Sequence, residues 1–289
     1  MTASQRLEVS AAARHDAMVA AYDAQRARLA PDRSDAWAGC AQFFKADPRR
    51  ELDALLSKIA SYLRPDDTLL DVGGGAGRMS LPLSFHCREV IVIDPSSAME
   101  ETFQATAKEA GIANARFLRR DWLEGGDVEG DVALVAHVTY FIPKVVPFIE
   151  KLNAAARRRV VVNVRTVPPP NQASELFRMA RGEELMLVPG HDELLAVLSE
   201  MGIAADLIDV GPALLPATAP AGKTREDAIR IEVDGAVRGG WLKEEEKERL
   251  GAMIEQRFDE LLAKTPEGFR RRIALHARDL LITWETKSA

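Results

Sequence analysis

The sequence predicts a doubly wound α/β fold, in which helices cover both faces of a mostly parallel, seven-stranded sheet. Three observations predict it. Short apolar segments alternate with helical patterns from residue 68 to residue 210, a glycine-rich turn follows the first segment, and one more apolar segment closes the chain. Alternation of this kind implies parallel strands joined by right-handed crossovers. The expected strands are 68–72, 89–93, 115–118, 131–137, 160–165, 204–210 and 280–284.

Helical patterns fill the intervals between these strands. A helix-forming composition covers residues 1–30, and Asp47 followed by Pro48 is a typical N-cap and first-turn pair for a helix leading into the first strand. A strongly charged segment, 244–264, is expected to form a late helix. The remaining expected helices are 77–85, 97–110, 143–156 and 191–201.

The length of 289 residues suits one large domain with additions. We expect an N-terminal helical segment (1–64) that forms part of a substrate cap, a core (65–211) with a proline-bounded insertion (166–190), and a C-terminal helical insertion with the closing strand (212–289). The cap is expected to line the substrate pocket.

The charge balance disfavours nucleic acid as a partner. The chain has 38 basic and 44 acidic residues, a net charge of −6, whereas phosphate binding needs a clustered excess of Lys and Arg. The two basic runs, 157–159 and 270–272, are more typical of solvated helix ends or loops.

Composition also bears on metals and on location. Cys40 and Cys87 have no spacing typical of a zinc site or a disulfide framework, so we expect no metal. The N-terminus lacks the apolar core of a signal peptide, and no stretch approaches the length of a membrane span. We therefore expect a cytoplasmic protein without a membrane partner.

The turn after the first strand is the most informative segment. It carries Gly73, Gly74, Gly75 and Gly77, preceded by Asp71. Glycines between a strand and a helix let backbone amides approach a ligand closely, and the helix dipole favours polar or anionic groups there.

The glycine spacing argues against two common nucleotide sites. A dinucleotide fingerprint that began at Gly73 would need glycine at position 78, where the chain has Arg78. No Gly-Lys-Ser/Thr follows, which excludes the Walker pattern. A ligand without a diphosphate is therefore favoured.

Segment 71–77 resembles the first motif of class I S-adenosylmethionine (AdoMet)-dependent methyltransferases, a family with a Rossmann-like fold. The resemblance covers residues 68–165, and implies AdoMet as cofactor, bound on the glycine turn, and a small-molecule acceptor. It also implies that Asp94, which ends the second strand, accepts hydrogen bonds from the ribose hydroxyls.

The resemblance assigns the adenine and methionine ends of the cofactor to later strand ends. Asp121 is implied to contact the adenine amino group and Trp122 to line the ring, with Pro95 and Ser96 flanking the base. His137, at the end of the fourth strand, is implied to lie at the methionine end.

His137 and Tyr140 are the candidate catalytic residues. The reference pKa of a histidine lies near neutrality, so His137 is a candidate general base, and Tyr140 a candidate for orienting the acceptor. Because AdoMet carries an activated methyl group, alignment of the acceptor supplies most of the rate gain, and a base is needed only for a protonated acceptor.

Each residue also has a structural interpretation. Asp71 can cap the turn, Asp94 can form an Asx turn before Pro95, and Trp122 or Tyr140 can be a core aromatic. Consecutive placement of such residues at strand ends favours a cofactor crevice, where open α/β sheets bind ligands. Two other functions stay open: an NAD(P)-dependent oxidoreductase and a non-catalytic AdoMet-binding module. The oligomeric state and the acceptor atom are not determined by the sequence.

Overall fold

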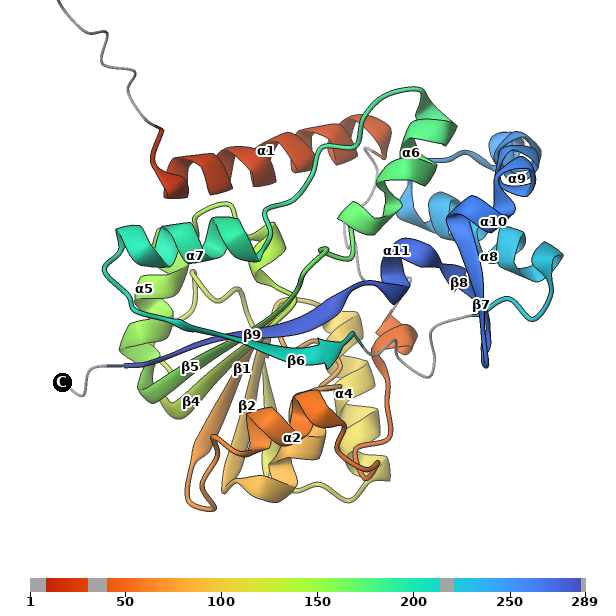
Figure 1. Cartoon of the computed structure of the whole chain (residues 1–289). Helices are drawn as coiled ribbons and strands as arrows, with labels where there is room; N and C mark the ends of the chain where they lie inside the picture. The colour runs from red at the N-terminus through yellow and green to blue at the C-terminus, as the bar shows by residue number, and fades with distance from the viewer. Residues whose placement is uncertain (1–8, 31–40, 214–220, 287–289) are drawn as a thin grey trace, which may run out of the picture.

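The computed structural model describes residues 9–30, 41–213 and 221–286, and its centre is the seven-stranded sheet (Figure 1). The strand order is β3-β2-β1-β4-β5-β9-β6. Only β9 is antiparallel, pairing with β5 on one side and β6 on the other. The sheet strands are β1 (Thr68–Val72), β2 (Glu89–Asp94), β3 (Ala115–Arg119), β4 (Gly130–Ala136), β5 (Ala156–Arg165), β6 (Asp206–Pro212) and β9 (Arg278–Glu285).

This sheet confirms the predicted fold class, and each expected strand corresponds to an observed one. The central strands read as apolar because both of their faces are buried: every residue of β1 is buried, as parallel sheets require. The helices are α1 (Ala11–Leu29), α2 (Ala54–Ala60), α3 (Ser80–Leu83), α4 (Ser97–Glu109), α5 (Val145–Ala155), α6 (Ser174–Arg181), α7 (His191–Glu200), α8 (Arg225–Gly239), α9 (Lys247–Gln256), α10 (Phe258–Leu261) and α11 (Arg272–Leu275).

Two apolar layers fix the helices to the sheet. Phe148 and Leu152 of α5 pack with Leu194 of α7 on one face, while Leu56 of α2 packs with Phe103 of α4 on the other. Figure 1 shows α5 and α7 on the side of the sheet that α1 covers, and α2 and α4 on the opposite side. None of the helices in the described ranges is long and apolar enough to cross a membrane.

Helix α1 lies along α7 and is held at both ends. The backbone N–H of Ala11 donates to Glu200 Oε1 at 2.6 Å, and Gln25, near the other end, donates to the Glu184 carbonyl at 2.9 Å. The predicted N-terminal helix is confirmed over the residues described, and its anchoring makes it a fixed wall beside the carboxyl ends of the strands.

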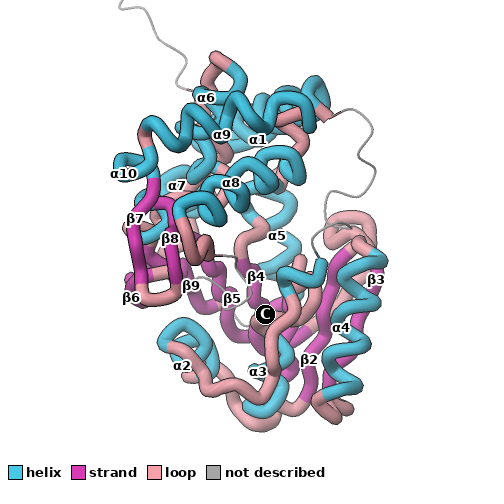
Figure 2. The backbone as a smooth tube through the Cα atoms, turned by 90° about the vertical axis from the view of Figure 1, so that its right-hand side faces the viewer, coloured by secondary structure: helices cyan, strands magenta, loops and turns pink. Residues whose placement is uncertain are grey.

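A second cluster of helices forms beside the sheet. Leu176 and Met179 of α6 pack with Leu250 and Ile254 of α9 and with Phe258 of α10. Figure 2 shows α6, α8, α9 and α10 gathered with the two-stranded sheet of β7 (Leu262–Thr265) and β8 (Gly268–Arg271).

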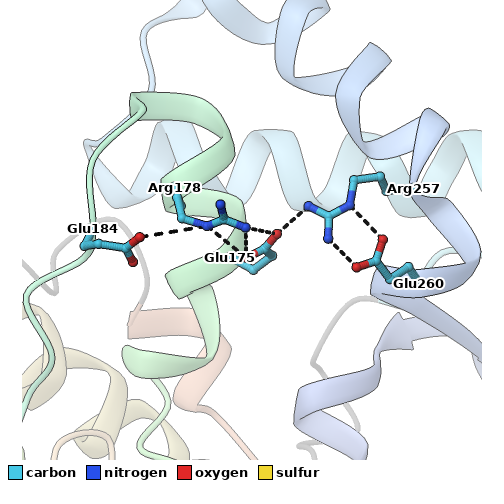
Figure 3. A network of polar contacts seen from close by, with 5 residues as sticks. All are labelled: Glu175, Arg178, Glu184, Arg257 and Glu260. Atoms are coloured by element: carbon cyan, nitrogen blue, oxygen red, sulfur yellow. Dashed lines mark hydrogen bonds and ion pairs between the residues drawn. The ribbon is translucent and has the colours of Figure 1, made fainter.

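Hydrogen bonds between charged side chains stabilise the surface of this helical cluster. Arg257, between α9 and α10, donates to Glu175 of α6 and to Glu260 of α10, and Arg178 donates to Glu175 at 2.7 Å (Figure 3). The network joins the insertion within 166–190 to the C-terminal part of the chain.

Three of the predicted helices were wrong in their extent. The helix expected over 77–85 consists only of α3, Ser80–Leu83, followed by a 3-10 turn at Ser84–His86. The charged segment 244–264 breaks into a short 3-10 turn, α9 and α10, and its last residues enter β7, because the tight turn at residues 266–267 folds β7 back against β8. The helix expected at Asp47 begins after Asp53, whose carboxylate accepts from the Leu56 N–H at 2.8 Å. Asp47 instead forms a local turn, accepting from the Arg49 N–H at 2.9 Å.

Candidate functional site

The glycine turn lies between the end of β1 and α3. Gly73 has a φ of +70°, and its N–H donates to the Ile93 carbonyl at 2.7 Å, which ties the turn to β2. A Cβ at Gly73 would lie 2.4 Å from Val138 Cγ2, and one at Gly74 would lie 2.2 Å from Asp71 Oδ2. The turn therefore needs glycine, and its backbone borders a cavity directly.

Asp71 is fully buried at the end of β1, below this turn. Neither of its carboxylate oxygens has a hydrogen-bond partner among the described residues. Burial raises the pKa of Asp71 to about 7; the nearby Ser80 hydroxyl partly offsets this rise, and the charge of Asp94 adds to it. A buried carboxylate without partners is costly, so a cationic ligand group in the cavity would satisfy it.

Asp94 ends β2 and braces the same turn. Its Oδ2 accepts from the Gly75 N–H at 3.1 Å, and its Oδ1 accepts from the Ser96 N–H at 2.9 Å. Asp94 and Pro95 line the cavity, whereas Ser96 lies outside its lining and caps α4 by accepting from the Met99 N–H at 3.3 Å.

The end of β3 supplies the next wall. Asp121 and the buried Trp122 both line the cavity, and the Lys151 ammonium lies 5.1 Å from the centre of the Trp122 ring. The Asp121 carboxylate accepts from the Leu123 N–H at 2.7 Å, which fixes the direction of the loop. The Trp122 indole N–H has no partner among the described residues.

His137 follows β4 and adopts a φ of +61°, the only positive φ of a non-glycine residue in the described chain. Its N–H donates to the Asn163 carbonyl at 2.9 Å, which holds the backbone against β5. Strained backbone of this kind is typical of functional sites. Burial lowers the pKa of His137 well below its usual value, with further lowering by the charges of Arg165 and Arg78.

Tyr140 lies deeper than His137, and only 1% of its surface is exposed. Its hydroxyl accepts from the Arg165 N–H at 2.7 Å and lies 3.4 Å from His137 Nδ1. Burial raises the pKa of Tyr140 far above its usual value. The phenol therefore stays protonated at neutral pH.

Two arginines line the cavity near His137. Arg165, which ends β5, donates to Asp279 of β9 at 3.2 Å, and both side chains are buried. Arg78 follows the glycine turn, is half-buried, and forms no hydrogen bond or ion pair through its guanidinium within the described ranges. Burial lowers the pKa of Arg78, and the charges of Arg165 and Arg50 add to this effect.

These strand ends open into one cavity of about 820 Å³. This volume falls in the range of small-molecule sites. Beyond His137 the walls are largely aromatic and aliphatic, and they come from α1, the segment between β4 and α5, α5 itself, the insertion and the C-terminal cluster. These wall residues are Tyr22, Leu29, Phe141, Ile142, Phe148, Pro169, Pro170, Phe177, Leu185 and Trp241.

Most of the residues predicted from the sequence meet in this cavity. Gly77 and Ser96 lie outside its lining, and Gly77 instead packs closely against α3 and α4. The residues that line it are Asp71, Gly73, Gly74, Gly75, Asp94, Pro95, Asp121, Trp122, His137 and Tyr140. The sequence did not predict Arg165 as a residue of the site. Arg78 served there only as evidence against a dinucleotide fingerprint, although an arginine directly after a glycine turn was a usable signal for a binding residue.

Residues 69–159 match a family model described as a methyltransferase domain. These residues run from β1 into β5 and include every strand end described above except the end of β5 itself. The glycine turn and its acidic neighbours thus fall within the matched domain.

Sequence relatives match parts of the chain. A 23S rRNA (uracil(1939)-C(5))-methyltransferase of Aeromonas hydrophila is 40% identical over 65 residues, which are 22% of this chain and 14% of that protein. An uncharacterized protein of Haemophilus influenzae is 27% identical over 150 residues, 51% of this chain and 55% of that protein. The chain therefore covers less than two thirds of these relatives.

Solved structures share the fold at low identity. The YcgJ protein of Bacillus subtilis has a TM-score of 0.51 at 15% identity, covering 81% of this chain and 98% of that one. A coclaurine N-methyltransferase bound to N-methylheliamine and SAH has a TM-score of 0.52 at 10% identity, covering 93% and 87%. The likeness extends over the sheet and its helices.

Proposed function

We propose that this chain, which matches a methyltransferase domain model at residues 69–159, transfers a methyl group from AdoMet to a small, largely apolar acceptor. The observation that carries the proposal is the continuity of the cavity. It runs from the glycine turn and Asp94, past His137, to aromatic walls contributed by α1 and the C-terminal cluster. One continuous cavity therefore offers room for the cofactor and for an acceptor beside it.

The residues at the strand ends fit AdoMet. Asp71 offers an unpartnered buried carboxylate to the cationic part of the cofactor, and the glycine turn leaves room that a Cβ would fill. Asp94 is placed to accept from ribose hydroxyls, and Asp121 with Trp122 to hold the adenine. When bound, AdoMet supplies a methyl group already activated on its sulfonium.

The chain's own contribution is alignment and exclusion of water. His137 is neutral at pH 7 because its pKa is lowered, so its ring is free to accept a proton, but as a weak base. The Tyr140 hydroxyl receives the Arg165 N–H and sets the position of the His137 ring. This arrangement suits an acceptor that arrives with its lone pair available, and both residues act in orientation.

A small acceptor accounts for the charge distribution better than RNA does. Each side chain of the basic run 157–159 is already paired, Arg157 with Asp131, Arg158 with Asp67, and Arg159 with Glu285. This run thus offers no free track for phosphates.

The chemistry of the rRNA relatives also finds no counterpart in the described residues. Attack on a pyrimidine ring needs a cysteine thiolate in the site, whereas Cys87 lies between α3 and β2, at the end of the sheet away from the cavity. Burial raises the pKa of Cys87 to about 11, so it remains a thiol. Cys40 lies outside the described residues.

Calorimetry with AdoMet, S-adenosylhomocysteine and NADH tests the cofactor assignment. We expect binding of the first two and none of NADH; binding of NADH alone would favour an oxidoreductase. Release of S-adenosylhomocysteine in a screen of small acceptors tests transfer. Firm AdoMet binding with no turnover on any acceptor would favour a non-catalytic binding module, and turnover on rRNA alone would overturn the small-molecule assignment.

A further inference from the structure

Arg78 is an arginine of the cavity wall whose charge is not neutralised by a contact. Its side chain is half-buried, yet its guanidinium has no hydrogen bond or ion pair within the part of the chain that the structure describes. Burying an arginine without a partner costs free energy, so such residues are typically paired. The Arg78 guanidinium therefore lies at the cavity wall without a paired counter-charge from the described chain.

The two acids that attract Arg78 are already engaged by other groups. Arg165 and Arg50 repel Arg78, while Asp279 and Asp53 attract it. Asp279 already accepts from Arg165 at 3.2 Å, and Asp53 caps α2. Neither carboxylate is hydrogen-bonded to Arg78, and His137 adds no charge at neutral pH because its pKa is lowered.

Arg78 interacts electrostatically with groups at the β5 end of the cavity. These groups include Arg165 at the end of β5 and Asp279 at the start of β9, both beyond β4 from the glycine turn. The charge that acts on Asp71 is that of Asp94 at the end of β2. The carboxylates of Asp71 and Asp94 are thus grouped towards β2, whereas the guanidinium groups of Arg78 and Arg165 are grouped towards β5.

We infer that Arg78 binds a carboxylate of the methyl acceptor, and that the acceptor is an apolar or aromatic acid. This inference rests on the proposed function. A guanidinium matches a carboxylate with two parallel hydrogen bonds. The single positive charge of one guanidinium balances one carboxylate, whereas a phosphate group carries nearly two negative charges.

The aromatic walls of the cavity define the rest of the acceptor. Phe177 of α6 and Trp241, which follows α8, lie with ring centres 5.6 Å apart, and both line the cavity with Tyr22 and Phe141. Aromatic side chains bury apolar ligand surface and position it through their rigid rings. The acid group would then face the sheet and the apolar body would face the cap.

Paired ligands test this inference on the full chain loaded with S-adenosylhomocysteine. The probes are phenylacetate, 4-phenylbutyrate, indole-3-acetate and decanoate, each measured by calorimetry beside its uncharged amide. We expect at least one acid to bind more tightly than its amide by about 10- to 100-fold, the range for a hydrogen bond to a charged group. Arg78→Gln should remove this difference, and Arg78→Lys should restore part of it.

Two controls keep the result specific. Arg14→Gln removes a positive charge from an exposed position on α1 and should leave the preference for acids unchanged. The Arg50 guanidinium donates to the backbone carbonyl of Arg78, a bond that Arg78→Gln preserves, and a thermal melt verifies the fold of each variant.

Three outcomes would overturn the inference. The first is that no acid binds better than its amide, and the second is that Arg78→Gln leaves the preference intact. The third is that Arg78→Gln weakens the binding of AdoMet but not that of 5′-methylthioadenosine. This outcome would mean that the guanidinium holds the methionine carboxylate of the cofactor. Failure of S-adenosylhomocysteine itself to bind would instead count against the proposed function.

Discussion

Asp94 Oδ2 accepts the Gly75 N–H at 3.1 Å, so the carboxylate that ends β2 holds the turn that follows β1. The same carboxylate borders the cavity. One side chain therefore shapes the turn and faces the position proposed for the ribose, and its two roles can be separated by substitution.

We expect Asp94→Ala to weaken AdoMet binding by about 1.5 to 3 kcal/mol, because charge-assisted hydrogen bonds to the ribose hydroxyls are lost. Asp94→Asn, which keeps one acceptor oxygen, should lose less. Calorimetry measures both. Glu89→Ala, at the other end of β2, removes a surface pair with Arg116 and serves as the control. Unchanged affinity in Asp94→Ala would remove the ribose role.

The pKa of Asp71 makes the stability of the ligand-free protein depend on pH. An acid whose folded pKa (about 7) exceeds its unfolded value (3.8) binds its proton more tightly when folded. The free energy of unfolding therefore falls as pH rises from about 4 to about 7, by a few kcal/mol for this group. Asp71→Asn should remove this contribution, which denaturant titrations at several pH values will detect.

Asp71 should also couple AdoMet binding to pH. A cationic cofactor next to the carboxylate favours its ionised form, so binding below pH 7 releases a proton and is weaker than at pH 8. The affinity of Asp71→Asn should be lower and nearly constant between pH 6 and pH 8. An equal pH dependence in wild type and variant would show that Asp71 does not face the cation.

The sequence predicts the sheet and the acidic half of the cavity well because both have local signals. Buried parallel strands are apolar runs, and Asp71 and Asp94 directly follow or end such runs. The basic half lacks a local signal. Arg165 meets Asp279 across 114 residues of sequence, a pairing set by the insertion of β9 beside β5.

The errors at helix ends have a physical cause as well. Asp47 and Asp53 are equally good caps in isolation, and burial of Leu55, Leu56 and Ile59 against the sheet selects the later start. Segment 262–271 forms a hairpin because Leu262 is buried in the C-terminal cluster and β8 pairs with β7. Tertiary packing overrides local propensity in both cases.

Gly73→Ala should destabilise the protein more than Gly111→Ala. Both glycines have similar φ values, +70° and +65°, so both variants bear the left-handed strain of about 1 to 2 kcal/mol. Only at Gly73 does the new Cβ meet a neighbour, Val138 Cγ2 at 2.4 Å, whereas nothing lies within 4 Å at Gly111. Chemical denaturation measures the difference, and AdoMet binding should be lost only in Gly73→Ala. Equal destabilisation would contradict the tight fit of the turn.

His137 should remain neutral throughout the physiological range. The pKa of His137 is lowered, so the folded state disfavours the protonated ring. The free energy of unfolding should therefore fall as the pH drops below the unfolded pKa of about 6.5. NMR of the ring carbons should show no titration between pH 6 and pH 8. His137→Asn, which tolerates a positive φ, should preserve AdoMet binding. A titration midpoint near 6.5 would contradict the enclosure of the ring by the cavity.

Arg165 and Asp279 should show strong coupling in a double-mutant cycle. Both side chains are buried, with 9% and 5% exposed. Asp279→Asn leaves the Arg165 charge near Arg78 without its counter-charge, so we expect a loss of about 3 kcal/mol in the free energy of unfolding. Arg165→Met leaves the Asp279 charge buried and should cost a similar amount. The double variant should lose clearly less than the sum of the two single losses, because neither charge then remains.

The exposed pair Arg225–Asp259 provides the reference cycle, where near-additive changes are expected. Additive losses at Arg165 and Asp279 would mean that other groups neutralise Arg165 and that the two side chains are not coupled.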